Sequence, residues 1–126
     1  MNANLNIVFS RPPGGVSQED FNRWYDAHLH EILLVPGFVA ARRYRLDPVV
    51  IDPETPAWPF LAVFEIDGDP ANAIEEQKKM GLSTRESYIK FKEEHQIGPP
   101  LPEWWDGVRF ASWNCVTLGD RVKRAD

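Results

Sequence analysis

Two segments of the sequence are apolar on both faces of the strand that each predicts, and this restricts the fold more than any other feature. In residues 58–68, WPFLAVFEIDG, Phe60 and Phe64 alternate with Leu61 and Val63. In residues 107–118, GVRFASWNCVTL, Phe110 alternates in the same way with Ala111 and Trp113. Successive side chains of a strand point to opposite faces of a sheet. The sequence therefore predicts a sheet that is covered on both sides.

The remaining segments carry clear helix and strand signals. Residues 4–9 alternate as a strand, and residues 37–46 form a second strand with Phe38, Ala40, Arg42, Tyr44 and Leu46 on one face. Between them, apolar residues recur at steps of three and four after the helix N-cap Ser17, which predicts a helix that ends before Pro36-Gly37. These residues are Phe21, Trp24, Tyr25, His28, Leu29, Ile32 and Leu33.

Two more helices are expected between the third and fourth strands. Asp69 and Pro70 form a cap and first turn for one helix, which ends at Gly81, and residues 83–86, S-T-R-E, predict a capping box for the next. The order is β-α-β-β-α(α)-β, so we predict a single ferredoxin-like α+β domain over residues 1–126, with an antiparallel sheet and helices on one face.

One layer of helices covers one face of such a sheet. A bare apolar face is an aggregation liability, and the simplest cover for it is a second copy of the chain. We therefore expect a homodimer in which two sheets pack together around a two-fold axis, forming a dimeric α+β barrel.

Composition excludes several classes of function. The chain has 126 residues and a net charge of −5 without a long basic run, so we expect no nucleic-acid partner. No apolar run approaches the roughly 20 residues of a membrane span, and the N-terminus lacks the features of a signal peptide. The single cysteine, Cys115, fits a reducing cytoplasm, where we expect the protein to reside.

Two of the three histidines lie in the first helix, at positions 28 and 30. Successive helical residues are rotated by about 100°, so these two side chains point roughly 200° apart and do not chelate one ion. His28 and Glu31 share a face, but two ligands make a weak metal site. We predict no metal. His30 is then a solvated surface residue, whereas His28, within the apolar stripe, is either a core histidine with one hydrogen bond or a functional group.

The run FNRWYDAHLHEILLVPGFVAARRYRL resembles the first helix and second strand of the dimeric α+β barrel superfamily, and it is most similar to the EthD-like branch. The resemblance rests on Trp24-Tyr25, His28-Leu29, Pro36-Gly37-Phe38 and Arg42-Arg43-Tyr44, and covers about the first 46 residues. It implies a pocket between sheet and helices, small aromatic or polyketide-like substrates, and proton-transfer or cofactor-free oxygen chemistry. It also implies His28 as the candidate acid/base.

The residues themselves are compatible with that role. A histidine at a partly apolar cavity suits removal of a proton next to a carbonyl. Tyr25, one turn earlier, either orients the imidazole or binds a substrate oxygen, or it packs in the core as an ordinary aromatic residue. We therefore predict a cofactor-independent cyclase, isomerase or lyase that acts on a small aromatic or cyclic carbonyl compound. The alternatives are a cofactor-free monooxygenase, a non-catalytic small-molecule binder, and, less favoured, a haem-degrading protein with His95 as axial ligand.

Further residues are candidates for the same pocket. His95 shares one face of the third helix with Tyr88 and Phe91. It either converges on His28 in the pocket or lies at the helix C-terminus because the helix dipole favours a histidine there. Arg42 offers a two-pronged donor for a substrate oxygen or an ion pair at a dimer edge. Trp24 is a core or pocket-wall residue, and Trp104-Trp105 forms an aromatic flap over a pocket or across the dimer. Ser112 and Asn114, on the last strand, offer polar contacts in a pocket.

Overall fold

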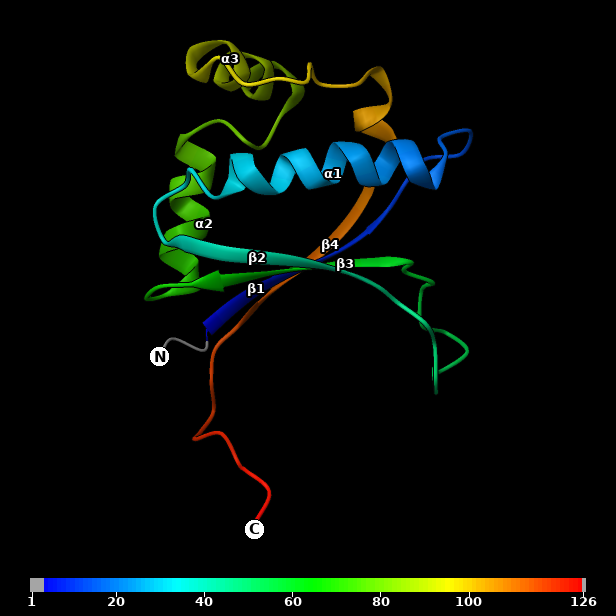
Figure 1. Cartoon of the computed structure of the whole chain (residues 1–126), viewed down its shortest axis with the longest axis vertical. Helices are drawn as coiled ribbons and strands as arrows, with labels where there is room; N and C mark the ends of the chain where they lie inside the picture. The colour runs from blue at the N-terminus through cyan, green and yellow to red at the C-terminus, as the bar shows by residue number, and fades with distance from the viewer. Residues whose placement is uncertain (1–3, 126) are drawn as a thin grey trace.

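The computed structural model describes residues 4–125 (Figure 1). Four strands, three α-helices and one short 3-10 helix follow one another along the chain. Their bounds are β1 Asn4–Arg11, α1 Gln18–Ile32, β2 Phe38–Arg45, β3 Phe60–Ile66, α2 Pro70–Lys79, α3 Arg85–His95, η1 Glu103–Gly107 and β4 Arg109–Cys115. The element order is the one that the sequence predicts.

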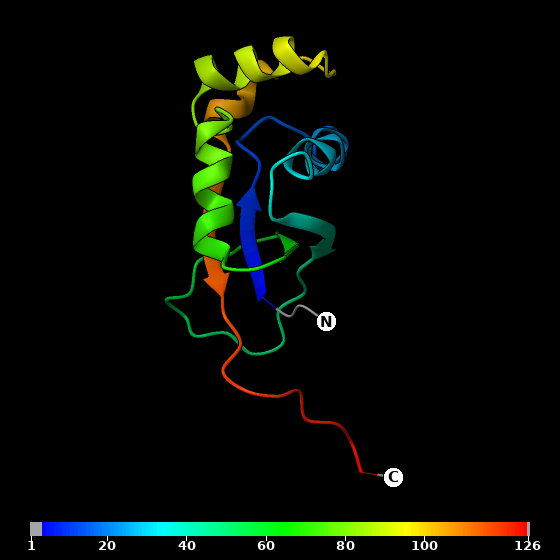
Figure 2. The same ribbon diagram turned by 90° about the vertical axis from the view of Figure 1, so that its left-hand side faces the viewer.

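The four strands form one antiparallel sheet in the order β2-β3-β1-β4. Helices α1 and α2 pack on one face of this sheet, and α3 lies beyond α1, farther from the strands (Figures 1 and 2). The ferredoxin-like α+β fold is thereby confirmed, and β3 is one of the two inner strands of the sheet. No helix among residues 4–125 has the length and hydropathy that crossing a membrane requires.

The first two helices begin where the sequence predicts. The Asp20 backbone N–H donates to Ser17 Oγ at 3.0 Å, and the Ala71 N–H donates to Asp69 Oδ1 at 3.0 Å, with Pro70 in the first turn. Each cap satisfies a backbone donor that the first turn of a helix leaves free.

The capping box of α3 is displaced by one residue from its predicted position. Thr84, not Ser83, is the N-cap, and its partner is Ser87, not Glu86. The Ser87 N–H donates to Thr84 Oγ1, and the Thr84 N–H donates to Ser87 Oγ. Ser87 Oγ also donates to the Gly81 carbonyl at 2.6 Å, and this link to the end of α2 favours the displaced register.

A β-bulge in β2 changes which of its side chains face the helices. The register shifts between Phe38 and Ala40, so Phe38 faces the helices together with Ala41 and Arg43. The predicted alternation, which put Phe38 and Arg42 on the same face, is wrong for this reason. An extra residue in a bulge reverses the facing of everything that follows it.

The core lies between the sheet and the helices and is rich in aromatic side chains. Phe21, Trp24, Tyr25 and Ile32 of α1 are buried there, which confirms the apolar stripe predicted for this helix. The opposite sheet face carries Ile7, Phe9, Leu61, Val63 and Trp113, and the chain itself leaves it partly exposed; Trp113 has 55% of its surface accessible.

Candidate active site

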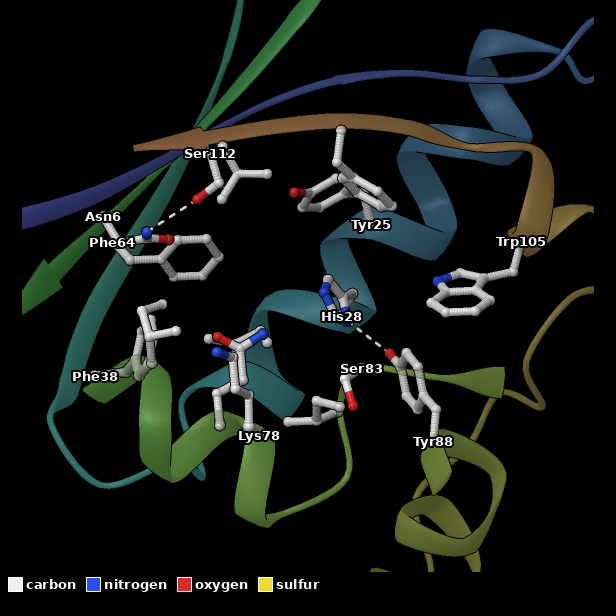
Figure 3. Close-up of a pocket in the computed structure, with 16 residues that line it drawn as sticks. Asn6, Tyr25, His28, Phe38, Phe64, Lys78, Ser83, Tyr88, Trp105 and Ser112 are labelled. Carbon is white, nitrogen blue, oxygen red and sulfur yellow. Dashed lines mark hydrogen bonds between the residues drawn. The ribbon is translucent and has the colours of Figure 1, made fainter. Parts of the chain in front are cut away.

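A cavity of about 320 Å³ lies between the helix-facing side of the sheet and the three α-helices (Figure 3). The strands contribute Asn6, Phe64 and Ser112 to its wall, and α1 contributes Tyr25 and His28. Residues of α2, Tyr88 of α3 and Trp105 of η1 complete the wall. Most of the wall is apolar or aromatic, so the few polar groups determine what the cavity binds.

His28 is held on three sides. The Trp24 ring stacks on the imidazole with 5.0 Å between centroids and a 13° angle between planes. The imidazole Nδ1 lies 2.6 Å from Tyr88 Oη and 3.1 Å from Glu31 Oε1. Nε2 forms no hydrogen bond with any group in residues 4–125. The ring therefore has one nitrogen fixed by protein and the other left for a ligand.

Glu31 is the buried centre of this network, with 1% of its surface accessible. Tyr88 donates its hydroxyl hydrogen to Glu31 Oε1, and the Lys92 ammonium donates to Oε2. Lys92 also donates to the Pro99 carbonyl at 2.9 Å, which ties the segment after α3 to the same group. A buried carboxylate is tolerated when it is paired and hydrogen-bonded in this way.

The surroundings keep the Glu31 carboxylate ionised. Burial alone raises its pKa, but the hydrogen bonds from His28, Lys92 and Tyr88 outweigh burial and lower the pKa below its ordinary value. An ionised carboxylate accepts hydrogen bonds only, so the proton of a neutral imidazole lies on Nδ1. This leaves the Nε2 lone pair free. Burial, and then the adjacent Glu31 carboxylate, raise the pKa of Tyr88, which keeps this phenol protonated as a donor.

Tyr25 supplies a second polar group. Burial raises the pKa of its phenol, which therefore stays protonated. The hydroxyl forms no hydrogen bond within residues 4–125, and the side chain lines the cavity. The Arg43 guanidinium lies 4.4 Å from the centroid of the Tyr25 ring, and its charge partly opposes the effect of burial on the Tyr25 pKa. Tyr25 is thus placed to donate a hydrogen bond to a ligand.

The predicted site residues separate into two groups. Tyr25, His28 and Tyr88 line the cavity. Trp24 stacks behind His28, and Asn114 accepts a hydrogen bond from the cavity residue Asn6 at 2.9 Å.

The other predicted residues lie elsewhere. Phe91 is buried in the core, where its ring contacts Tyr88. Arg42 is exposed on the outer sheet face, because the bulge in β2 turns it away from the helices. His95 ends α3, its ring lies 4.3 Å from that of Phe91, and its Nδ1 is 3.0 Å from the Phe91 carbonyl. It does not converge on His28, because the helix ends and the ring folds back on its own last turn.

The tryptophan pair after α3 is divided between two roles. Trp104 packs on Trp24 and Phe21, outside the cavity wall, whereas Trp105 lines the cavity and meets the Tyr88 ring edge-on at 5.7 Å. Adjacent residues of a turn point in different directions, and the sequence gives no basis for choosing between two identical side chains.

Sequence reasoning missed Glu31, Lys92 and Asn6. A signal was present for two of them, because Glu31 follows His28 by three residues and Lys92 follows Tyr88 by four, the spacings at which helical side chains share a face. Nothing local shows that the two helices meet through these charges. His30 is exposed, and no cluster of three His, Cys, Asp or Glu side chains in the described part of the chain is placed to hold a metal ion.

The fold and the cavity define a ferredoxin-like α+β protein with a small-molecule-sized pocket on the helical side of its sheet. A scan against protein-family models gives no match, and neither does a search of curated protein sequences. No match supports the narrower resemblance to the EthD-like branch, which stays a prediction.

Solved structures share the fold. At3g17210 from Arabidopsis thaliana matches 95% of this chain and 100% of its own, at a TM-score of 0.62 and 9% identity. HapK from Hahella chejuensis matches 98% and 100%, at a TM-score of 0.54 and 12% identity. A provisionally assigned monooxygenase from Shewanella loihica PV-4 matches 95% and 99%, at a TM-score of 0.53 and 12% identity. At such identities the likeness shows the fold alone.

Proposed function

We propose that this protein is an enzyme that transfers a proton at the carbon next to the carbonyl group of a small aromatic or cyclic compound, without a cofactor. The observation that carries the proposal is the arrangement of His28. Its Nδ1 faces the buried Glu31 carboxylate at 3.1 Å, and its Nε2 is left to the cavity. A base that is oriented and kept in one tautomer by a carboxylate is suited to general base catalysis.

The proposed step uses two side chains. The Nε2 lone pair of His28 takes a proton from the carbon beside the carbonyl, and the electrons of that C–H bond move into the carbonyl, forming an enolate. The Tyr25 hydroxyl donates to the enolate oxygen, where the negative charge develops. Return of the proton from His28 to another carbon gives an isomerisation. Attack of the enolate carbon on a second carbonyl of the same molecule gives a cyclisation, in which the new alkoxide takes the proton back from His28. Glu31 stabilises the imidazolium that forms in between.

Exchange of hydrogen for deuterium tests this step without knowledge of the natural substrate. A panel of aromatic ketones is incubated with the protein in D₂O, and loss of the proton signal next to the carbonyl is followed by NMR. His28→Gln keeps side-chain volume and a hydrogen bond but removes the base, so the enzyme-dependent rate should fall by about 10²–10⁴-fold. His30→Gln, on the exposed side of the same helix, should leave the rate unchanged.

Equal rates for the two variants contradict the assignment of His28, provided that both show the wild-type circular dichroism spectrum. Ligand binding without any exchange in the wild-type protein points instead to a non-catalytic binder.

A cofactor-free monooxygenase in the same cavity is the second candidate. It is favoured by the aromatic wall, in which Tyr25, Phe64 and Trp105 surround the ligand space, and by the name of the Shewanella loihica neighbour. Deprotonation by His28 is also the first step there, because an electron-rich enolate or phenolate is the species that reacts with oxygen. Uptake of oxygen with a ketone or phenol from the panel distinguishes this candidate from simple proton transfer.

A further inference from the structure

We propose that Asn6 and Ser112 form a subsite that binds a hydroxyl group of the substrate, and that the substrate is an uncharged, hydroxylated ring compound. This inference rests on the proposed function, because it takes the cavity beside His28 as the substrate site. The subsite lies on the sheet wall of the cavity, whereas His28 projects from α1 (Figure 3). A ligand that reaches both would have a polar group at each end of an apolar ring system.

Asn6 has a fixed orientation in the wall. Its Nδ2 donates to Ser112 Oγ at 3.0 Å and to Asn114 Oδ1 at 2.9 Å, and lies 3.4 Å from the Trp113 carbonyl oxygen. A backbone carbonyl only accepts hydrogen bonds, so the nitrogen, not the oxygen, of the amide faces β4. The Oδ1 atom is consequently turned away from these partners.

That oxygen lacks a partner of its own. Asn6 is 4% exposed, and its Oδ1 accepts no hydrogen bond from any group in residues 4–125. The Oδ1 atom is not fully closed off by protein, so its acceptor sites are open to water or to a ligand. Asn6 lines the cavity, so a ligand donor in the cavity is the group that would pair with Oδ1.

Ser112 offers the complementary half. Its Oγ accepts the hydrogen bond from Asn6, so its own hydrogen is free to donate. An acceptor and a donor then lie side by side on neighbouring strands. A hydroxyl group both donates and accepts, and therefore matches this pair, whereas an ether or ketone oxygen uses only the Ser112 half.

The charges of the wall argue for a neutral ligand. Lys78 is the one Lys or Arg among the lining residues, and its Nζ lies 3.5 Å from Glu75 Oε1 on a side chain that is 64% exposed. Its ammonium is thus already close to a carboxylate, on a side chain that is largely exposed to solvent. The Glu31 carboxylate is buried behind His28. A carboxylate or phosphate on the ligand would lose its hydration without gaining a cation.

Calorimetric binding of three matched probes tests the proposal. The probes are a naphthyl methyl ketone with a hydroxyl group on the distal ring, the same ketone without the hydroxyl, and the same ketone with a carboxylate in its place. The variants are Ser112→Ala, Ser112→Thr and Asn6→Leu. Ser83→Ala is the matched control, because Ser83 lines the opposite part of the cavity and belongs to the segment between α2 and α3. Ser112 is exposed, so its truncation should not disturb folding.

The hydroxylated ketone should bind wild-type protein about tenfold more tightly than the unsubstituted one, the ratio expected for one or two net hydrogen bonds. The carboxylate should bind more weakly than both. Ser112→Ala and Asn6→Leu should bring the ratio of the two ketones close to one, Ser112→Thr should restore it, and Ser83→Ala should leave it unchanged.

Equal binding of the two ketones to wild-type protein overturns the proposal, and so does an affinity ratio that is unchanged in both Ser112→Ala and Asn6→Leu. Tighter binding of the carboxylate than of the ketones, or no binding of either ketone, also overturns it. The proton-transfer proposal is tested separately, because His28→Gln should abolish exchange and leave this ratio intact. If wild-type protein shows the expected affinity ratio but catalyses no exchange, the proton-transfer proposal is wrong and the subsite proposal still holds.

Discussion

At the scale of single residues, Glu31 connects the stability of the protein to the arrangement of His28. Its carboxylate accepts from Tyr88 and Lys92 and faces His28 Nδ1, so one buried group determines which nitrogen of His28 is free. A surface carboxylate would do this poorly, because water would compete for the same hydrogen bonds. Burial protects the hydrogen bonds of Glu31 from water. Because the carboxylate is buried, the stability of the fold also depends on its ionisation.

Stability should fall in acid because of Glu31. Its pKa is lower in the folded protein than the ordinary 4.5, so the stabilisation is complete above pH 4.5 and is lost as the pH falls through the folded-state pKa. The free energy of unfolding, measured by denaturant titration from pH 7 downwards, should therefore decrease below pH 4.5. Glu31→Gln should be less stable than wild type at pH 7 and should show a flatter acid limb. Glu94→Gln, an exposed residue of α3, should reproduce the wild-type curve, and an identical slope for both variants would contradict the role of Glu31.

At the scale of elements, α3 matters because it brings Tyr88 and Lys92 onto α1. Side-chain hydrogen bonds of Arg85, Tyr88 and Lys92 tie α3 to η1, α1 and the segment after the helix. The Thr84–Ser87 capping box is the local interaction that defines where the helix begins. The start of the helix sets the rotation of every later side chain by about 100° per residue. The displaced cap therefore belongs to the arrangement that points Tyr88 and Lys92 toward Glu31.

Thr84→Ala should destabilise the protein by about 1 kcal/mol, because it removes the oxygen that accepts from the Ser87 N–H. Ser83→Ala should change the free energy of unfolding by less than about 0.5 kcal/mol, since Ser83 is exposed and caps nothing. Chemical denaturation of both variants shows whether Thr84, the N-cap in the structure, or Ser83, the N-cap that the S-T-R-E pattern predicts, stabilises the start of α3. A larger loss for Ser83→Ala would favour the pattern.

At the scale of the whole molecule, the outer sheet face carries apolar side chains that the chain itself leaves partly exposed. Trp113 packs edge-on against Phe9 at 5.7 Å and is still 55% exposed. The segment after β4 leads away from the sheet, and its Leu118 and Val122 side chains are almost fully exposed (Figures 1 and 2). We propose that a second copy of the chain covers this face, as the two-sided strands already suggest.

Light scattering of the protein at micromolar concentration should give the mass of two chains. Trp113→Lys places a charge in the middle of the proposed interface and should shift the mass to one chain. Ile89→Lys changes an exposed apolar residue of α3 and should leave the dimer intact. A monomeric wild-type protein, or equal behaviour of the two variants, would count against the sheet-to-sheet dimer.

The elements and their order follow from local patterns in the sequence. The stripe of α1, the caps Ser17 and Asp69, and the alternating strands are local signals, because helix and strand periodicity and first-turn hydrogen bonds involve residues close in the chain. That is why the ferredoxin-like fold and the inward direction of Tyr25 and His28 could be predicted.

Which side chains meet depends on how the elements pack in three dimensions. The bulge in β2 removed Arg42 from the helical side, and the end of α3 left His95 outside the cavity. The Glu31–Lys92 pair joins residues 61 positions apart, and Asn6 and Ser112 are 106 positions apart. Contacts over such separations depend on the register and packing of whole elements, where a shift of one residue redirects a side chain, and no local pattern encodes that register.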